Sequence, residues 1–201
     1  MEAVCAGGKL QRCRTALLGA IPAPQQVLVY GEGNGRFLVE LLRRFPDARV
    51  TVVEASAVMI DLARARLQRA GLPGARVEFI HADALTWQPL AAAFDLIVTC
   101  FFLDCFREDE LQQLVPGIAY AATADAHWLY ADFQIASEGL RRVCSRVIVG
   151  FLYEFFHWAT GLPARELVNV EPFLTAAGFT RRGRQEFVFG LLFCDWWSRV
   201  K

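Results

Sequence analysis

The stretch Val27-Leu28-Val29-Tyr30-Gly31-Glu32-Gly33-Asn34-Gly35-Arg36-Phe37 joins an apolar strand, a turn with alternating glycines and the start of an amphipathic helix. Glycine lets the backbone approach a ligand closely and adopts dihedral angles that other residues avoid. This layout is typical of a nucleotide-binding loop. The spacing is G-x-G-x-G, whereas a dinucleotide loop of the form G-x-G-x-x-G/A needs a small residue where this chain has Arg36.

The chain around this loop has the size and composition of one domain. It has 201 residues, of which 21 are basic and 21 acidic, and no linker-like segment divides it. The balanced charge gives no overall field that would attract nucleic acid or an anionic membrane, so we expect a small ligand. We interpret the arginine-containing segments 12–14, 141–146 and 181–184 as solvated faces without a function.

The pattern of cysteines and the hydropathy of the chain indicate the cellular compartment of the protein. The six cysteines form no C-x-x-C pair and only three histidines accompany them, so we expect no zinc site and no metal requirement. The first residues lack the basic segment and long apolar core of a secretory signal. The most apolar tract, residues 147–158, is short for a membrane span and contains Glu154 and His157. We therefore expect a cytoplasmic, reduced protein without a transmembrane segment.

From Val27 onward, strand and helix patterns alternate, which predicts an α/β fold with a mostly parallel sheet. Strands are predicted at 27–30, 50–53, 77–80, 94–98 and 128–131, and helices at 9–20, 37–45, 57–70, 108–122 and 140–158. Ser56 should cap the third of these helices, which carries Met59, Leu62, Ala63 and Leu67 inward, and Pro116 should kink or divide the fourth. The apolar stretches 179–187 and 191–197 predict a terminal hairpin around Gly190.

Two acidic residues follow predicted strands at the edge where open α/β sheets bind ligands. Glu54 comes 19 positions after Gly35, and its carboxylate could accept hydrogen bonds from both hydroxyls of a ribose. Asp83 could accept a bond from an exocyclic adenine amine, while the backbone amide of Ala84 meets a ring nitrogen. Either carboxylate alone could instead cap a helix or lie in solvent. Their joint placement favours an adenosine ligand.

Four segments in this order resemble the class I S-adenosylmethionine-dependent methyltransferases: VLVYGEGNGRF (27–37), VVEASAVMIDLARARL (52–67), EFIHADAL (78–85) and FDLIVTCFFLD (94–104). The resemblance covers about residues 25–199. It implies S-adenosylmethionine as the cofactor and a Rossmann-like three-layer sandwich with a seven-stranded sheet whose last strand is antiparallel. It also divides a single domain, 1–201, into an N-terminal helical cap (1–24), a cofactor-binding core (25–134) and an acceptor-side helix with the hairpin (135–201).

The resemblance assigns roles to particular residues. The loop glycines would contact the methionine part of the cofactor and Glu54 the ribose. Met59 and Asp83 would lie near the adenine, and Cys100 and Phe101 would form the wall beside the sulfonium. The complete expected cofactor set is Tyr30, Gly31, Glu32, Gly33, Asn34, Gly35, Glu54, Ala55, Met59, Asp83, Ala84, Cys100 and Phe101.

One position departs from the family pattern. The family usually has an acidic residue two places before the first glycine, and this chain has Val29 there. Glu32, inside the loop, could take over that role with its carboxylate near the cofactor's ammonium group, or it could point to solvent. Both alternatives remain open at this level.

Methyl transfer is an in-line displacement at a carbon bonded to positive sulfur, so the protein mainly aligns the reactants and excludes water. A general base is needed only for a protonated nucleophile. The candidates are Asp104, Asp132 and His157. Asp104 is either functional or a helix cap, Asp132 either functional or bonded to loop amides, and His157 either a base or a packing residue.

The acceptor side of the site is aromatic. Phe101, Phe102, Phe106, Phe133, Tyr153, Phe155, Phe156 and Trp158 could wall an apolar pocket or belong to the core. The loop after the fourth strand lacks the Asn/Asp-Pro-Pro-Tyr/Phe segment that similar enzymes use to hold a planar amine or amide. We therefore expect a small-molecule acceptor, with room for an apolar or aromatic one. Trp196 and Trp197 leave room for a homodimer surface.

Two other functions remain alternatives. One is a catalytically silent S-adenosylmethionine-binding protein with a regulatory or structural role, which the missing acidic residue at Val29 favours. The other is a nicotinamide-dependent oxidoreductase, which would also use Glu54 but is opposed by Arg36.

Overall fold

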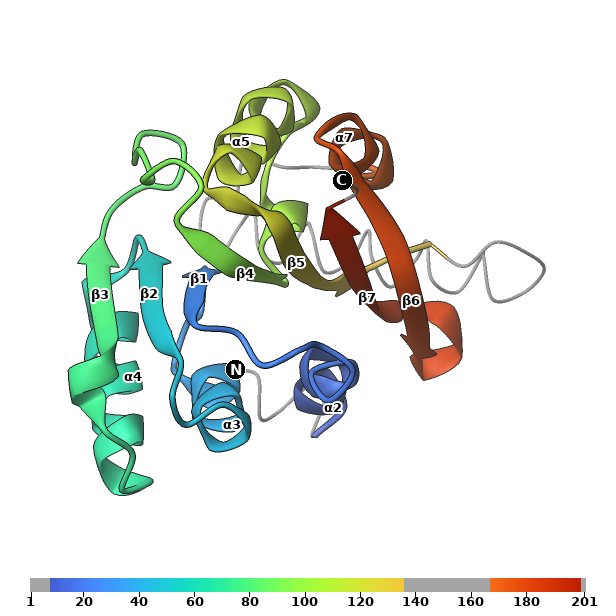
Figure 1. Ribbon diagram of the computed structural model, residues 1–201. Coiled ribbons are helices and arrows are strands. Elements are labelled where there is room, and N and C mark those ends of the chain that lie inside the picture. Colours follow the sequence, from blue (N-terminus) through green and yellow to red (C-terminus); the bar gives the residue numbers. More distant parts are fainter. Residues whose placement is uncertain (1–7, 136–166, 200–201) are drawn as a thin grey trace.

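The computed structural model describes residues 8–135 and 167–199, so the predicted helix 140–158 and His157 lie outside the described residues. Seven strands form one sheet with helices on both faces (Figure 1). The strands are β1 (Gln26–Tyr30), β2 (Arg49–Glu54), β3 (Val77–His81), β4 (Phe94–Cys100), β5 (Ala122–Phe133), β6 (Phe179–Phe187) and β7 (Leu192–Arg199).

The strand order is β3-β2-β1-β4-β5-β7-β6. Strands β1 to β5 pair in parallel, and β7 is antiparallel to both of its neighbours, β5 and β6. This confirms the predicted α/β fold with its antiparallel C-terminal strand. Because β1 to β5 run in the same direction, their carboxyl ends meet at one edge of the sheet.

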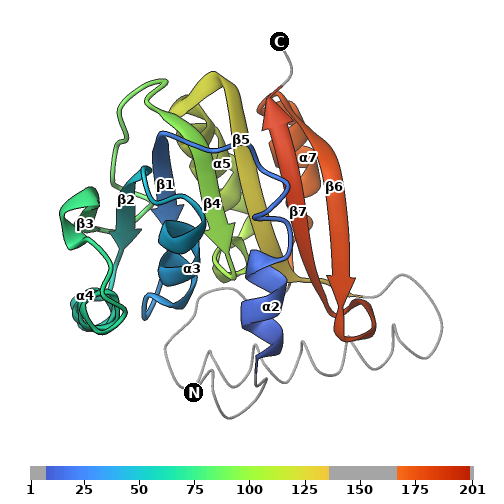
Figure 2. The same cartoon turned by 60° about the horizontal axis from the view of Figure 1, so that its bottom comes forward.

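The helices form the two outer layers of the sandwich. On one face lie α2 (Lys9–Thr15), α3 (Arg36–Arg44) and α4 (Ala57–Arg69), and on the other lie α5 (Glu108–Tyr120) and α7 (Glu171–Ala176), as Figures 1 and 2 show. Short 3₁₀ segments occupy Gly74–Arg76, Leu103–Cys105 and Val188–Gly190. No helix among residues 8–135 and 167–199 is long and apolar enough to cross a membrane.

Each central strand contributes side chains to two separate apolar cores, one on each face of the sheet. In β1, Val27 and Val29 pack into the core beneath α2 and α3, whereas Leu28 and Tyr30 pack into the core beneath α5 and α7. All four side chains are 2% exposed or less. Burial on both faces explains why the strand is continuously apolar rather than alternating.

Three details differ from the sequence-based expectation. Helix α4 buries Ile60, Ala63 and Leu67, while Met59 and Leu62 are 37% and 44% exposed, so their inward placement was wrong. Helix α5 is not divided at Pro116, because its flanking apolar residues are buried against the sheet and hold both halves in one helix. Strand β5 begins six residues before the predicted start, at Ala122.

Candidate functional site

The glycine loop between β1 and α3 uses its three glycines for different purposes. Gly31, Gly33 and Gly35 have φ angles of +63°, +65° and +83°, a region that other residues rarely adopt. A Cβ on Gly31 would collide with the ring of Phe102, and a Cβ on Gly35 would lie 2.8 Å from Cα of Ala63 in α4. Gly31 therefore admits the ring of Phe102, and Gly35 lets the loop pack directly against α4.

Gly33 differs from the other two because a Cβ there would meet no atom within 4 Å. Its surroundings are open, and a side chain at this position would project into the space beside the loop. A loop with positive φ angles and open space at its middle glycine has room for a ligand that contacts the backbone. The geometry thus fits the predicted role of Gly33.

Glu54, at the end of β2, joins the glycine loop to the start of α4. Its Oε2 accepts a hydrogen bond from the backbone N–H of Gly33 and its Oε1 one from that of Ser56, both at 3.0 Å. Ser56 in turn caps α4, as predicted, by accepting from the N–H of Met59 at 3.3 Å. A carboxylate has about four acceptor positions, so Glu54 can hold the loop and still accept from ribose hydroxyls.

Glu32 does not point to solvent. Its side chain is 6% exposed, and Oε1 accepts a hydrogen bond from the N–H of Leu38, in the first turn of α3, at 3.0 Å. A negative charge at a helix N-terminus satisfies an amide that has no partner within the helix and is favoured by the helix dipole. This removes the solvent alternative, and a contact with the cofactor's ammonium group stays a prediction.

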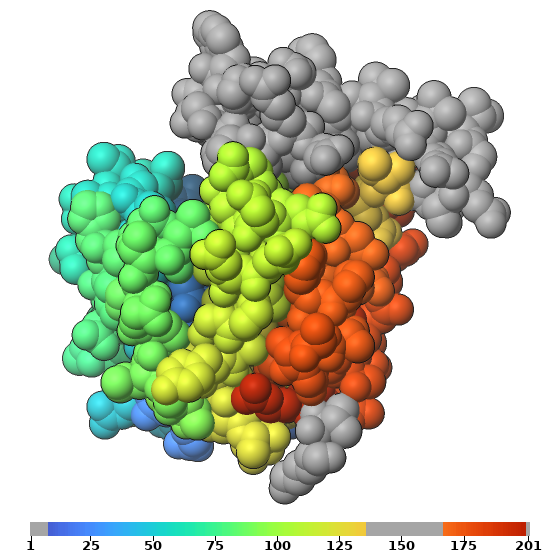
Figure 3. Space-filling model, turned by 90° about the horizontal axis from the view of Figure 1, so that it is seen from above, coloured from blue at the N-terminus to red at the C-terminus, as the bar shows by residue number. Residues whose placement is uncertain are grey.

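The segment after β3 forms a turn in which Asp83 is exposed. Its Oδ1 accepts from the N–H of Leu85 at 2.9 Å, and its carbonyl oxygen accepts from the N–H of Trp87, also at 2.9 Å. Figure 3 shows a hollow between this green segment and α5. A cavity of about 150 Å³ there is lined by Tyr30, Ala84 and Trp87 together with residues of α5. The predicted roles of Asp83 and Ala84 toward adenine remain predictions.

A cluster of aromatic side chains packs against the glycine loop from the side of β4. The ring of Phe102 stacks on Tyr30 with a centroid distance of 5.6 Å, and Trp87 and Phe106 contact these two rings edge-on. Phe101 has a φ of +53°, which is unusual for a residue with a side chain, and its N–H donates to the carbonyl of Ala131 at 2.7 Å. The ring of Phe102 therefore lies directly against the glycine loop.

Sequence analysis missed Arg14, which we had placed on a solvated face. The structure shows it 6% exposed, with its guanidinium carbon 5.3 Å from the centre of the Phe101 ring. A signal was available, because Arg14 is four residues after the apolar Leu10 and so lies on the same face of α2. Its neighbour Cys13 is fully buried and donates its thiol hydrogen to the carbonyl of Phe193 at 3.1 Å.

In segment 181–184 the prediction of a solvated face is correct for the exposed Arg181 and Arg182 but wrong for Arg184, which is partly buried. Arg184 forms two hydrogen bonds of 2.7 Å with the carboxylate of Asp195, whose side chain is completely buried. Both Arg184 and Arg181 also contact Glu171 of α7, at 2.7 and 2.6 Å. These arginines therefore attach α7 to the end of the sheet rather than bind phosphate.

The two predicted catalytic carboxylates of the described residues lie together. Asp132, at the end of β5, accepts from the N–H of Asp104 through Oδ2 at 3.2 Å and from the N–H of Phe133 through Oδ1 at 2.9 Å. The two side chains also hydrogen-bond to each other, which requires a proton on one of them. Asp132 is fully buried, whereas Asp104 is half-buried.

Burial and mutual repulsion change the acidity of this pair. Burial raises the pKa of Asp104 to about 6, partly offset by its hydrogen bonds to Cys105 and Asp132. Burial raises the pKa of Asp132 as well, and the charge of Asp104 adds to that increase. Two carboxylates that share a site hold one proton between them over a wide pH range. Such a pair is a candidate for proton transfer near neutral pH.

Comparison with known proteins agrees with this geometry. Residues 27–124 match the family described as "Methyltransferase domain". Trans-aconitate 2-methyltransferase of Methylobacterium radiotolerans is 40% identical over 91 residues, which are 43% of this chain and 32% of that protein. The chain therefore spans only about a third of the length of this curated relative.

Solved structures share the fold. Mitomycin 7-O-methyltransferase MmcR superposes with a TM-score of 0.73 at 20% identity, covering 96% of this chain and 55% of that chain. The 1,6-didemethyltoxoflavin-N1-methyltransferase of Burkholderia thailandensis gives 0.68 at 19% identity, with coverages of 96% and 79%. The chain is similar to the class I S-adenosylmethionine-dependent methyltransferases, since residues 27–124, just under half of it, match the methyltransferase domain and the fold is shared. S-adenosylmethionine is the cofactor that this family implies, and the open face of Gly33 and the position of Glu54 fit it.

Proposed function

We propose that this chain transfers the methyl group of S-adenosylmethionine to a small-molecule acceptor. The observation that carries the proposal is the arrangement of Gly33, Glu54 and the Asp104–Asp132 pair at the edge where the carboxyl ends of β1, β2, β4 and β5 meet. The first two offer a backbone and a carboxylate to the cofactor. The last two offer a proton acceptor.

The cofactor, when bound, supplies a methyl group activated by positively charged sulfur. The chain's own contribution is to bind, orient and exclude water. We assign the loop residues 30–35 and Glu54 to binding, with Ala55, Met59, Asp83 and Ala84 on the adenine side. Cys100 and Phe101 wall the reacting centre, and burial raises the pKa of the Cys100 thiol, which therefore stays protonated and does not compete as a nucleophile.

Within the carboxylate pair, we assign proton transfer to Asp104. Both oxygens of Asp132 already accept backbone amides, and its side chain is fully buried, so Asp132 fixes the position of its neighbour. Asp104 is the more exposed member and can reach an acceptor. A proton leaving the acceptor's oxygen or nitrogen would pass to Asp104 as the new bond to the methyl carbon forms. A contribution of His157, which lies outside the described residues, remains a further prediction.

The acceptor pocket we propose is a cavity of about 300 Å³ beside the end of β5. Tyr130, Phe133 and Phe193 give it aromatic walls. Asn169 and Gln134 add hydrogen-bonding groups, and the ion pair of Glu171 with Arg184 also lines it. Such a lining suits a small apolar or aromatic acceptor with a few polar atoms. The similar enzymes named for mitomycin and 1,6-didemethyltoxoflavin support a small-molecule acceptor.

The test begins with binding and ends with turnover. Titration with S-adenosylhomocysteine and, separately, with NADH should show binding of the first only. Incubation with methyl-labelled cofactor and a metabolite extract should then transfer label to a small molecule, and Asp104→Asn should slow this transfer while leaving S-adenosylhomocysteine affinity unchanged. Binding without any transfer would favour the silent regulatory protein, and binding of NADH would overturn the cofactor assignment.

A homodimer and a cytoplasmic location remain proposals. Trp197 is 3% exposed within the single chain, and the indole N–H of Trp196 donates to Nδ1 of His127 at 3.1 Å. These two tryptophans therefore give little support to a dimer surface. Light scattering at two protein concentrations would decide the oligomeric state.

A further inference from the structure

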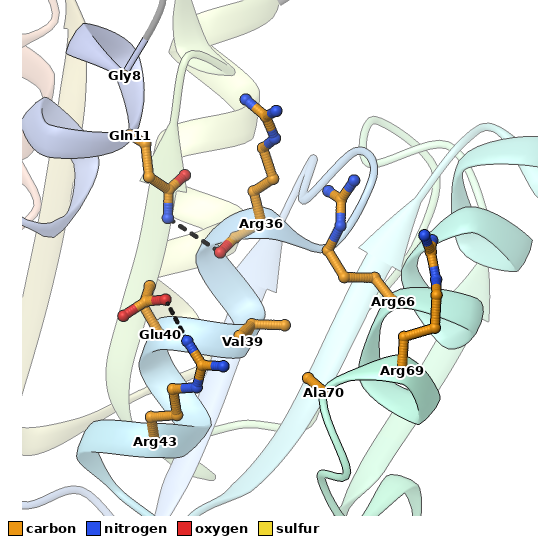
Figure 4. A pocket seen from close by; sticks show the side chains of 9 residues that line it. All are labelled: Gly8, Gln11, Arg36, Val39, Glu40, Arg43, Arg66, Arg69 and Ala70. Carbon is orange, nitrogen blue, oxygen red and sulfur yellow. Dashed lines mark hydrogen bonds and ion pairs between the residues drawn. The ribbon is translucent and has the colours of Figure 1, made fainter. Parts of the chain in front are cut away.

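A third cavity lies between α2, α3 and α4. It has a volume of about 660 Å³. Figure 4 shows its lining: Gly8, Gln11, Arg36, Val39, Glu40, Arg43, Arg66, Arg69 and Ala70. The amide of Gln11 donates to the carbonyl of Arg36 at 2.9 Å and so connects α2 to the start of α3.

The cavity concentrates positive charge in a chain that is neutral overall. Four arginines line it against a single acid, Glu40, which is paired with Arg43 at 3.0 Å. In Figure 4 the side chains of Arg36, Arg66 and Arg69 extend in the same direction, away from that pair. Guanidinium groups that line one cavity repel each other, and an anion between them removes this repulsion.

Two of these arginines are held in place by the backbone. Nη1 of Arg66 donates to the carbonyl oxygen and to Oδ1 of Asn34, at 2.8 and 2.6 Å, and Nε of Arg69 donates to the carbonyl of Ala65 at 3.1 Å. Fixing a long side chain before a ligand arrives lowers the entropy cost of binding. Arg66 and Arg69 are thus oriented in advance at the wall of the cavity.

We propose that this cavity binds a compact polyanion, a small molecule with at least two phosphate or carboxylate groups. Planar guanidinium groups match both kinds of oxyanion through paired N–H···O bonds. Phosphate and carboxylate compounds share this chemistry, and the probes below separate them. The four arginines line one cavity of the size of a small molecule, and a nucleic acid is included below as a competing ligand.

The cavity is connected to the glycine loop through Arg66, since this residue lines the cavity and also holds Asn34. An anion that attracts the guanidinium of Arg66 competes with Asn34 for it. Polyanion binding should therefore weaken cofactor binding, and the effect must be reciprocal. This regulatory part rests on the proposed function, whereas the anion site itself does not.

The experiment titrates the full chain with inorganic tripolyphosphate, pyrophosphate and citrate by calorimetry. We expect saturable binding of tripolyphosphate to one site, with weaker binding at higher salt. The double variant Arg36→Gln/Arg69→Gln should weaken it by about tenfold, because it removes two charge-assisted donors. The variant leaves Arg66 and its bonds to Asn34 intact. The matched control is Arg64→Gln on the same helix, which lies outside this cavity and should change the affinity less than about twofold.

The possible results of these titrations test the anion site and its link to the glycine loop separately. Binding of citrate rather than the phosphates would identify a carboxylate ligand and still support the site. The proposal is overturned if none of the three probes saturates, if the control loses as much affinity as the double variant, or if a short DNA duplex binds more tightly than tripolyphosphate. Unchanged S-adenosylhomocysteine affinity at saturating polyanion would overturn only the link to the glycine loop. Failure of S-adenosylhomocysteine to bind at all would count against the proposed function and leave the anion titration valid.

Discussion

Replacing Gly35 and Gly33 by alanine should have different consequences, although both residues have positive φ angles and lie in the same loop. At Gly35, a new Cβ would lie 2.8 Å from Cα and 3.0 Å from Cβ of Ala63. The backbone of a packed helix cannot move aside as a flexible side chain can. At Gly33, a new Cβ would meet nothing within 4 Å.

The expected magnitudes follow from these contacts. A left-handed conformation costs an alanine about 1–2 kcal/mol, and this applies to both variants. Overpacking against α4 adds about 1–3 kcal/mol for Gly35→Ala alone. The free energy of unfolding should thus fall by about 2–5 kcal/mol for Gly35→Ala and by about 1–2 kcal/mol for Gly33→Ala. In a chain of this size, each kcal/mol lowers Tm by roughly 2–4 °C.

Urea denaturation followed by tryptophan fluorescence measures both free energies, and Gly74→Ala is the control. Gly74 has space around it and no positive φ angle, so alanine there should change stability by less than about 1 kcal/mol. S-adenosylhomocysteine titration should show the opposite order, with the greater loss of affinity for Gly33→Ala, because its methyl group enters the open space beside the loop. Equal destabilisation by Gly33→Ala and Gly35→Ala would refute the proposed packing of the loop against α4.

Three further changes test other parts of the site. Glu54→Gln places an amide N–H₂ against a backbone N–H and should weaken S-adenosylhomocysteine binding by about 10- to 100-fold in calorimetry. Asp104 has a pKa of about 6, above the ordinary value of about 4, so the folded chain holds this proton more tightly than the unfolded chain. The contribution of this Asp104 proton to the free energy of unfolding is complete below about pH 4 and is lost as the pH rises through about 6. The rate of methyl transfer should rise over the same pH range. Asp104→Asn should remove the share of both pH dependences that Asp104 causes and leave the share of the buried Asp132, as urea denaturation and initial rates at a series of pH values would show. Arg184→Met removes both hydrogen bonds to the buried carboxylate of Asp195, leaves it the longer ion pair with Arg181 at 3.8 Å and should cost about 3 kcal/mol in denaturant unfolding, whereas Arg43→Met, at an exposed pair, should cost less than about 1 kcal/mol.

The sequence predicted the central sheet well because its signals are local. A continuous apolar run followed by a glycine turn and an amphipathic helix is typical of a strand that is buried on both faces. The start of β5 was missed because Thr123 to Ala126 alternates polar residues with alanines, which give only a weak strand signal, and because the pairing of β5 with β4 shifts register between Phe94–Ala122 and Leu96–His127. Likewise, Met59 and Ile60 are both apolar, and only the packing of α4 decides that Ile60 is buried.

The charged groups of the site were predicted less well than its backbone. Asp104 and Asp132 were recognised as candidates from their positions after strands, but their mutual hydrogen bond depends on the parallel register of β4 and β5. The burial of Arg14 and Arg184 depends on partners such as Phe101 and Asp195 that are far away in the chain. Local sequence identifies an arginine but does not say which distant partner covers it.

The position of β7 constrains the order in which this fold can be completed. The last strand along the chain fills an interior place in the sheet, between β5 and β6, and β6 pairs with the rest of the sheet only through it. During synthesis, β5 and β6 can therefore both be present before β7. The edge of each strand that later pairs with β7 is then unpaired. Such edges readily pair with other chains. Until Leu192 to Arg199 has left the ribosome, this protein should depend on chaperones or on rapid completion to avoid aggregation.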